Sequence, residues 1–371
     1  MTKTTRPFTP DWVSSPGDAI AEFLEERDWT QAQLAERLGY TTKHISLLIN
    51  GKASLNEETA LKLERVLGST AAFWLRYEAQ YRAALAKKEE ERRLQGWTSW
   101  LDQLPVKELM NQGVIPNCIL IAKNKPGVVK NLLQFFGVAS PEDWQKCYGK
   151  LEVSFRRTRK EQSDVGAISA WLRLGEIEAE KLDCPKYSQA KFEKAVREIR
   201  TLTVLPPAEF EPRMQQLCRE SGVVLVLVPS IKGAHVSGVA RWLNPHKALI
   251  QLSFYGKSND RFWFNFFHEA AHILLHNKDN KENIFLDEWD SGESLESEPE
   301  READQWAREF LISSEYEGEL AQLKSKADVV DFAARIGIHS GIVVGRLQHD
   351  HLIDRSWMNS FKESFCFQGV E

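Results

Sequence analysis

Residues 266–276 read FFHEAAHILLH, and the HExxH motif inside this apolar stretch decides how the C-terminal part of the chain folds. His268 and His272 are four residues apart, so on a helix of about 3.6 residues per turn they lie on the same face. Two imidazoles in that arrangement can bind one metal ion. Glu269 lies beside them and could take a proton from a metal-bound water, the general-base role of this motif. The stretch therefore predicts a helix with two metal ligands and a catalytic base.

A bare HExxH also arises by chance, so this interpretation depends on a third ligand. Residues 299–311 read PEREADQWAREFL, which is typical of a helix with proline in its first turn. At about 100° per residue, one face of this helix carries Glu300, Ala303, Asp304, Ala307 and Leu311. Glu302 points to roughly the opposite side. Glu300 is therefore the predicted third ligand.

Other residues near these ligands also suit a metal site. Ala303 and Ala307 are as small as the two alanines inside the motif, so the helices can approach closely enough for Glu300 to reach the ion. Asp304 could accept the imidazole N–H of a ligand histidine, which would fix its tautomer and raise its basicity. His276 lies too far along the helix to be a ligand, so we expect it to support the site from outside or to be structural.

Two histidines, one glutamate and an open fourth position are typical of catalytic Zn²⁺ that carries a water. Ligand chemistry alone does not exclude Mn²⁺, Fe²⁺ or Co²⁺. The ion would polarise a peptide carbonyl, while Glu269 would pass the water proton to the leaving amine. The alternative interpretation is a structural helix pair whose acidic side chains are solvated.

The composition is that of an ordinary globular protein. The chain has 371 residues, of which 42% are hydrophobic and 27% charged, and this length suits two or three domains. The sequence has no run of 18 apolar residues and no apolar signal-peptide core near its start, so we expect a cytoplasmic protein without a membrane partner. Its five cysteines are widely spaced without a CxxC pair, which favours reduced thiols.

Residues 16–68 predict a compact helical domain with a helix-turn-helix at its centre. Thr30 caps a predicted helix over residues 31–38, Gly39 supplies the turn, and Thr41 caps a second helix over residues 42–49. Leu34, Leu38, Ile45 and Leu48 are expected to form the shared core, and Ala35 to let the two helices cross closely. A helix-turn-helix either binds DNA or serves only in protein contact.

Local charge favours DNA binding, because no acidic residue occurs from Arg37 to Asn56 although the whole chain carries a net charge of −5. Arg37 is one candidate for phosphate contact. The predicted DNA-binding residues, which include both helix caps, are Thr30, Gln31, Thr41, Thr42, Lys43, Ser46, Asn50 and Lys52. Since such domains usually bind paired half-sites, we expect a homodimer on double-stranded operator DNA.

The centre of the chain predicts helices without a catalytic constellation. Mixed charges over residues 81–95 suit a solvated linking helix, and proline-broken helical spacing continues from residue 100 to 205. The basic residues Arg156, Arg157, Arg159 and Lys160 could contact DNA or an acidic partner, although a solvated patch is the favoured interpretation.

Apolar runs at 222–228, 236–243 and 248–254 predict a small sheet that leads into the motif helix. A short strand is predicted at 284–286, inside the acidic segment 279–298. Its edge could receive a substrate backbone by strand addition, or the segment is an ordinary surface loop. The predicted fold is mainly α with a small sheet (α+β), divided into a helix-turn-helix domain (1–84), a helical middle region (85–205) and a minimal metallopeptidase domain (206–371).

Two stretches of this chain resemble known families. Residues 16 to about 84 resemble HigA-type antitoxins of the Cro and xenobiotic-response repressor class, in WTQAQLAERLG at 29–39 and ISLLINGK at 45–52. Residues from about 218 onward resemble the ImmA/IrrE metallopeptidases. That second resemblance rests on DRF at 260–262, the HExxH, Glu300 with Ala303 and Asp304, and IHSGIVVGRL at 338–347.

The second resemblance implies a thermolysin-like site and the cleavage of helix-turn-helix repressors. The family's ligands fall on His268, His272 and Glu300, and its general base falls on Glu269. Asp304 stands where many relatives have Asn, and Ser340 stands where Pro is common. The tail, residues 328–348, itself resembles a helix-turn-helix, but its flanking acids and few basic residues favour a packing role.

Two functions follow as hypotheses. The first is a DNA-binding regulator with a zinc endopeptidase, active or latent, that cleaves a helix-turn-helix repressor in a stress, mobile-element or toxin-antitoxin circuit. The second is an antitoxin and autorepressor whose metallopeptidase-like domain binds a ligand or a cognate toxin without proteolysis. The fused domain itself could be the protease target, and the sequence names neither operator nor activating signal.

Overall fold

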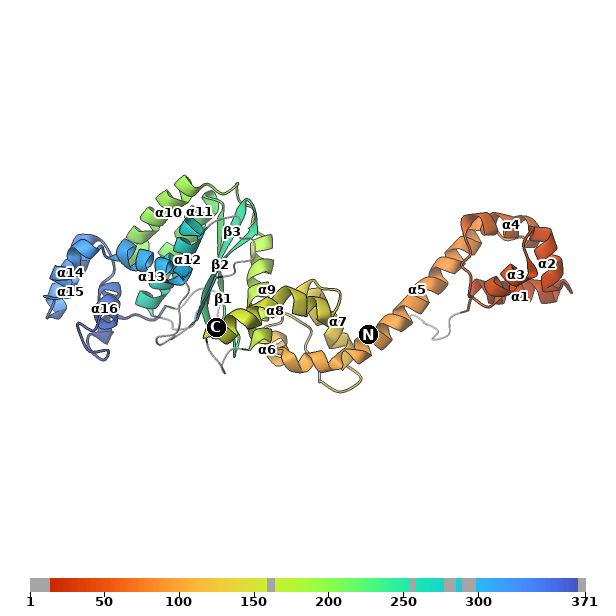
Figure 1. The fold of residues 1–371 in the computed structure, drawn as a ribbon, viewed down its shortest axis with the longest axis horizontal. Helices are drawn as coiled ribbons and strands as arrows, with labels where there is room; N and C mark the ends of the chain where they lie inside the picture. Colours follow the sequence, from red (N-terminus) through yellow and green to blue (C-terminus); the bar gives the residue numbers. More distant parts are fainter. Residues whose placement is uncertain (1–13, 159–163, 254–257, 277–284, 289–297, 366–371) are drawn as a thin grey trace, which may run out of the picture. The chain divides into compact units, whose positions relative to one another are not determined.

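The computed structural model describes residues 14–158, 164–253, 258–276, 285–288 and 298–365 (Figure 1). Two compact units make up the chain, one of Met1–Thr98 with Ile121–Gly127 and one of Ser99–Leu120 with Val128–Glu371. The predicted fold class, mainly helical with a small sheet, is confirmed. The division at residues 84 and 205 stays a prediction. Within the described ranges, every helix is too short or too polar to cross a lipid bilayer.

The first unit is helical. Its helices are α1 (Pro16–Glu26), α2 (Gln31–Leu38), α3 (Thr42–Ile49), α4 (Glu57–Leu67) and α5 (Ala71–Gly96). The bounds of α2 and α3 are those that the sequence predicts, because local signals fix both ends. The Thr30 and Thr41 hydroxyls accept from the N–H groups of Gln33 and His44, and Gly39 takes the left-handed conformation between the helices at φ 67°.

The core of this unit holds the predicted side chains. Leu34, Ala35, Leu38, Ile45 and Leu48 are all buried. Trp74 of α5 is also fully buried, and its indole N–H donates to the carbonyl of Gly68 at 3.2 Å. The linking helix predicted over residues 81–95 therefore begins earlier, at Ala71, because its first turns belong to this core.

The second unit begins with helices and continues into the sheet. Before the sheet lie η1 (Thr98–Gln103), α6 (Val106–Asn111), α7 (Lys125–Phe136), α8 (Pro141–Thr158), α9 (Val165–Glu180), α10 (Gln189–Thr201), η2 (Leu202–Val204) and α11 (Pro207–Glu220). After it lie α12 (Asn259–Leu275), α13 (Glu298–Leu311), η3 (Ser314–Tyr316), α14 (Glu317–Leu320), α15 (Lys326–Ile336), α16 (Ser340–His349) and η4 (Asn359–Phe361).

The sheet has the strand order β1-β3-β2-β4. β1 (Val223–Val228) runs parallel to β3 (Lys247–Ser253), and β2 (Val236–Asn244) runs antiparallel to both β3 and β4 (Phe285–Glu288). The three predicted apolar strands are confirmed. β4 overlaps the fourth predicted strand, whose first residue, Ile284, lies outside the described residues.

Helices cover both faces of this sheet (Figure 1). Ile250 and Leu252 of β3 belong to the core formed with α10, α11 and α12. Gln251, between them, points to the other face, where its amide donates to the Trp171 carbonyl of α9 at 2.7 Å. Both faces are buried, which explains why the strands read as nearly continuous apolar runs.

The tail contributes buried side chains to the core of the second unit. Gly337, which has φ 70°, caps the end of α15, and α16 follows after a short turn. Ile342, Val343, Val344 and Leu347 of α16 are buried in the core that also holds α12. This arrangement agrees with the packing role expected for residues 328–348.

Candidate metal centre and helix-turn-helix surface

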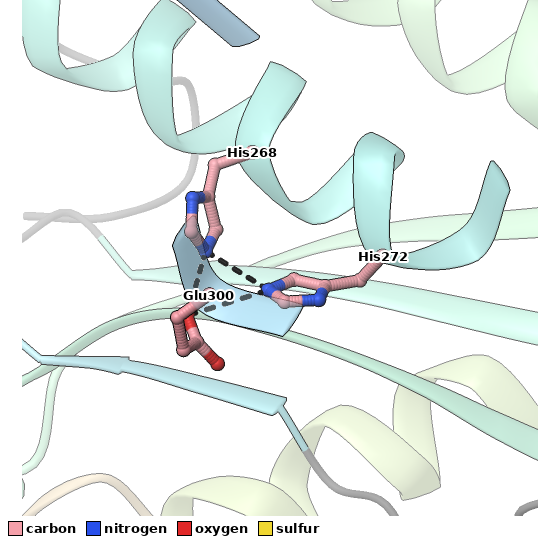
Figure 2. A group of neighbouring side chains, drawn as sticks. All are labelled: His268, His272 and Glu300. Atoms are coloured by element: carbon pink, nitrogen blue, oxygen red, sulfur yellow. Dashed lines mark hydrogen bonds and ion pairs between the residues drawn. The ribbon is translucent and has the colours of Figure 1, made fainter. Parts of the chain in front are cut away.

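α12 and α13 bring together the side chains of His268, His272 and Glu300 (Figure 2). The two Nε2 atoms lie 2.9 Å apart, and Glu300 Oε2 lies 3.1 Å from His268 Nε2 and 3.5 Å from His272 Nε2. The buried faces of both helices carry alanines, Ala270 and Ala271 on α12 and Ala303 and Ala307 on α13. This group could hold a metal ion.

The separations fit a small divalent cation. With bonds of about 2.0–2.1 Å, tetrahedral zinc ligands lie about 3.3 Å from one another. The observed separations of 2.9, 3.1 and 3.5 Å lie on both sides of that value. Three donor atoms of this kind suit zinc, and they also suit manganese, iron or cobalt.

The charge states of two donors are those that metal binding needs. Burial lowers the pKa of His272 to about 4, so its imidazole is neutral near pH 7. Burial would raise the pKa of Glu300, but hydrogen bonds with His268 and His272 outweigh it and lower the pKa to about 2. A neutral imidazole and an ionised carboxylate are the ligand forms of these residues.

Outside the donor group, carboxylates orient the histidines. His268 Nδ1 donates to Asp304 Oδ1 at 2.8 Å, which leaves Nε2 directed at the donor group. Asp304 in turn lies 3.7 Å from the Arg308 guanidinium. The donor-group histidine that Asp304 contacts is therefore His268 and not His272.

His276, at the C-terminal end of α12, contacts the donor group through His272. Its Nδ1 lies 2.9 Å from His272 Nδ1, and its Nε2 lies 3.1 Å from Glu302 Oε2. His276 is thus no member of the donor group, as expected. Glu302, predicted to point to roughly the opposite side of α13 from Glu300, lies outside the donor group with its side chain 54% exposed. Its carboxylate reaches His276 at the end of α12, a contact that the helical phase alone does not predict.

The Glu269 side chain packs against Gly238 of strand β2 and is fully buried. A Cβ atom at Gly238 would lie 2.4 Å from Glu269 Oε1, closer than nonbonded atoms can approach. Only glycine therefore fits at this position of β2 while Glu269 keeps its place. Gly238 was not among the predicted site residues, although a glycine within an apolar strand is a sign of such a close approach.

The helix-turn-helix presents most of its predicted DNA-binding residues to solvent. Those that are exposed are Thr30, Gln31, Thr41, Thr42, Lys43, Asn50 and Lys52, and Ser46 is half-buried. The Asn50 amide donates to the Ser46 carbonyl at 2.7 Å, so this side chain also closes the end of α3. The Arg37 guanidinium lies over the Trp29 ring, 4.1 Å from its centroid.

The predicted basic cluster and the predicted acidic segment lie partly outside the described residues. Arg156 and Arg157 belong to α8, whereas Arg159 and Lys160 lie outside the described residues. Most of the acidic segment 279–298 also lies outside them, with β4 and Glu298 as the described parts. Partner binding by the basic cluster and strand addition at the segment stay predictions.

Two segments of the chain match known protein families. The helix-turn-helix family model matches residues 20–74. An uncharacterized HTH-type transcriptional regulator of Escherichia coli strain K12, YddM, is 36% identical over 73 residues, which are 20% of this chain and 78% of YddM. The chain belongs to the helix-turn-helix transcriptional regulators. YbaQ, another uncharacterized regulator of this type from the same strain, is 37% identical over 67 residues, 18% of this chain and 59% of YbaQ.

The regulator carries a second family domain. The peptidase M78 model, described as the IrrE N-terminal-like domain, matches residues 218–348, which include the whole donor group. Among solved structures, an addiction module antidote protein of a HigA family from Coxiella burnetii is 31% identical. The alignment covers 22% of this regulator and 90% of that protein, with a TM-score of 0.21.

Proposed function

We propose that this regulator is a zinc-dependent endopeptidase tethered to operator DNA by its helix-turn-helix, and that it cleaves a helix-turn-helix repressor. The observation that carries the proposal is the convergence of His268, His272 and Glu300, next to Glu269, inside an IrrE-like domain. Two histidines and one glutamate leave a fourth ligand position for water or a substrate carbonyl.

Each residue of the site has a role in this proposal. A bound Zn²⁺ would supply Lewis acidity and an acidified water. Glu269 would accept the proton of that water and deliver it to the nitrogen of the leaving amine. Asp304 holds His268 in one tautomer through its 2.8 Å hydrogen bond, and Glu300 stays ionised.

The helix-turn-helix would bring the protease to its operator DNA. Lys43 and Lys52, with the caps of α2 and α3, would meet DNA phosphates. Thr42, Lys43, Ser46 and Asn50 would be the candidates for contact with base edges. A homodimer would bind two half-sites of one operator. A repressor bound at the same operator would then be within reach, which is why we propose this class of protein as substrate.

The decisive test is Glu269→Gln in the full chain. The variant should bind zinc with unchanged stoichiometry. Its proteolysis of helix-turn-helix regulators encoded beside it, or of a second copy of itself, should fall by about 10²–10⁴-fold, the contribution typical of a general base. Gln305→Ala, an exposed change on α13, is the matched control and should cut at the wild-type rate. Proteolysis that survives in Glu269→Gln would refute the mechanism.

One observation favours a second candidate, an autorepressor whose metal domain does not hydrolyse peptides. His268, Glu269 and His272 are all at most 2% exposed, so the two imidazoles and the Glu269 carboxylate have little contact with solvent, while the Glu300 side chain is 26% exposed. Under this candidate the wild-type chain binds DNA and metal but cuts no protein, and Glu269→Gln represses like the wild type. Co-purification of a small toxin with the chain would favour it further.

A further inference from the structure

Arg200, in the last turn of α10, donates to three backbone carbonyls on two other helices. Nε donates to Phe310 O at 2.9 Å, Nη2 to Leu311 O at 2.8 Å, and Nη1 to Ile336 O at 3.0 Å. Phe310 and Leu311 are the last residues of α13, and Ile336 is the last residue of α15. One guanidinium therefore caps the C-terminal ends of two helices.

Helix ends explain why an arginine is bound here. The last carbonyls of a helix have no partner inside it and form the negative end of the helix dipole. In the described part of the chain, the hydrogen bonds of the Arg200 guanidinium go to these three backbone carbonyls. A planar guanidinium with five N–H groups can reach several carbonyls at once, which a lysine ammonium cannot do with fixed geometry.

The register of α13 against α12 decides whether Glu300 reaches the two histidines. The buried residues Ala303 and Ala307 allow close approach to α12, and Phe310, whose carbonyl accepts from Arg200, packs against Phe267 of α12 with ring centroids 5.2 Å apart. A shift of one residue along the helix moves each side chain by about 1.5 Å and turns it by about 100°. Such a shift would carry Glu300 away from both histidines.

α10 provides a fixed reference for that register. Phe192, Val196 and Ile199 of α10 are fully buried in the same core as Phe266 and Phe267, the residues that precede the HExxH. Arg200 therefore sets the end of α13 against the same core that holds His268 and His272. It does so from outside residues 218–348, the segment that matches the IrrE-like model.

We propose that Arg200 is a positioning residue for the metal centre, which fixes the register of α13 so that Glu300 completes the donor group. The inference rests on the proposed metal function. It implies that the IrrE-like segment alone, cut away from α10, is an incomplete metal site.

The test measures Co²⁺ and Zn²⁺ affinity of the full chain, with the visible absorption of bound Co²⁺ as a readout of ligand geometry. Arg200→Met should weaken binding by about tenfold or more, in the range known for residues that orient metal ligands. Its Co²⁺ spectrum should shift toward that of Glu300→Ala. Arg200→Lys should bind with intermediate affinity. Arg197→Met is the matched control, because Arg197 lies on the exposed side of α10, 3.8 Å from Glu193, and should bind like the wild type.

A double variant separates positioning from general loss of structure. In a Glu300→Ala background, Arg200→Met should weaken metal binding no further, whereas general destabilisation would weaken it in both backgrounds. Wild-type affinity in both Arg200→Met and Arg200→Lys, or an additive loss in the double variant, would overturn the inference. A chain that binds metal through Glu300 but cuts no protein would defeat the proposed protease and leave the role of Arg200 standing.

Discussion

At the scale of single residues, the carboxylate of Asp304 decides which way His268 faces. Asp304 accepts from Nδ1, so the ring is held with Nε2 toward Glu300. Arg308, one turn further along α13, lies 3.7 Å from the same carboxylate. An Asp at this position adds a negative charge that Asn would not, and Arg308 compensates part of it.

Asp304→Ala should therefore weaken zinc binding about 10–100-fold, because His268 loses the partner that fixes its tautomer and orientation. Asp304→Asn, which can still accept through its amide oxygen, should lose less. Competition against a chromophoric chelator measures both affinities, with Gln305→Ala as the control on the same helix. Equal affinity of Asp304→Ala and the wild type would mean that the imidazole is held by its surroundings alone.

The sequence predicts which residues share a face of one helix. It does not predict contacts between residues that only the folded chain brings together. His268 and His272 share a helical turn, and the phase of residues 299–311 is enough to select Glu300. Gly238 meets Glu269 only because β2 crosses α12, and no local pattern encodes that contact. The contacts of Glu302 and Arg200 likewise depend on where separate helices end.

At the scale of elements, α2, its glycine turn and α3 form a unit whose ends are fixed by caps. The surface that it presents has no acidic residue from Arg37 to Asn56. Such a surface is expected to bind DNA with an affinity that falls as salt rises, since each phosphate contact releases a counterion.

Lys43→Ala should weaken operator binding at every sequence tested and reduce the slope of log affinity against log salt by about 1. Lys43 is exposed in the first turn of α3, where a lysine can reach a phosphate. Lys88→Ala on α5 removes the same charge elsewhere and should leave the slope unchanged. Fluorescence anisotropy over a salt series measures both, and parallel lines for Lys43→Ala and the wild type would argue against a phosphate contact.

Elements with strong end signals were predicted to the residue, and the arrangement of strands was not. Thr30, Gly39 and Thr41 mark the ends of α2 and α3 in the sequence itself. The order β1-β3-β2-β4 depends on pairing between distant segments, which apolar runs alone do not encode. The early start of α5 reflects burial of Trp74, another contact made across the sequence.

At the scale of the whole molecule, metal and folding should be coupled in the second unit. The donor group joins α12 to α13, which come from segments separated by more than twenty residues of chain. An ion bound there stabilises only the folded arrangement, because the unfolded chain does not bring the three side chains together.

Zinc at about 100 times its dissociation constant should add about 2.7 kcal/mol to the stability of this unit and raise its melting temperature by about 5–10 °C. Calorimetry before and after removal of metal with a chelator measures the shift. His272→Ala should melt at the same temperature with and without zinc. A wild-type unit whose melting is insensitive to chelator would show that the donors hold no ion.

The close approach of Gly238 to Glu269 limits which residues can replace this glycine during evolution. Every codon change away from glycine adds at least one carbon atom where the Glu269 carboxylate already stands. A variant at this position would therefore have to move the Glu269 carboxylate, so lineages that use this carboxylate as a general base are expected to keep glycine here. A lineage that has lost peptidase activity would no longer need glycine at position 238. Larger residues at this position in related sequences would then indicate that the activity has been lost.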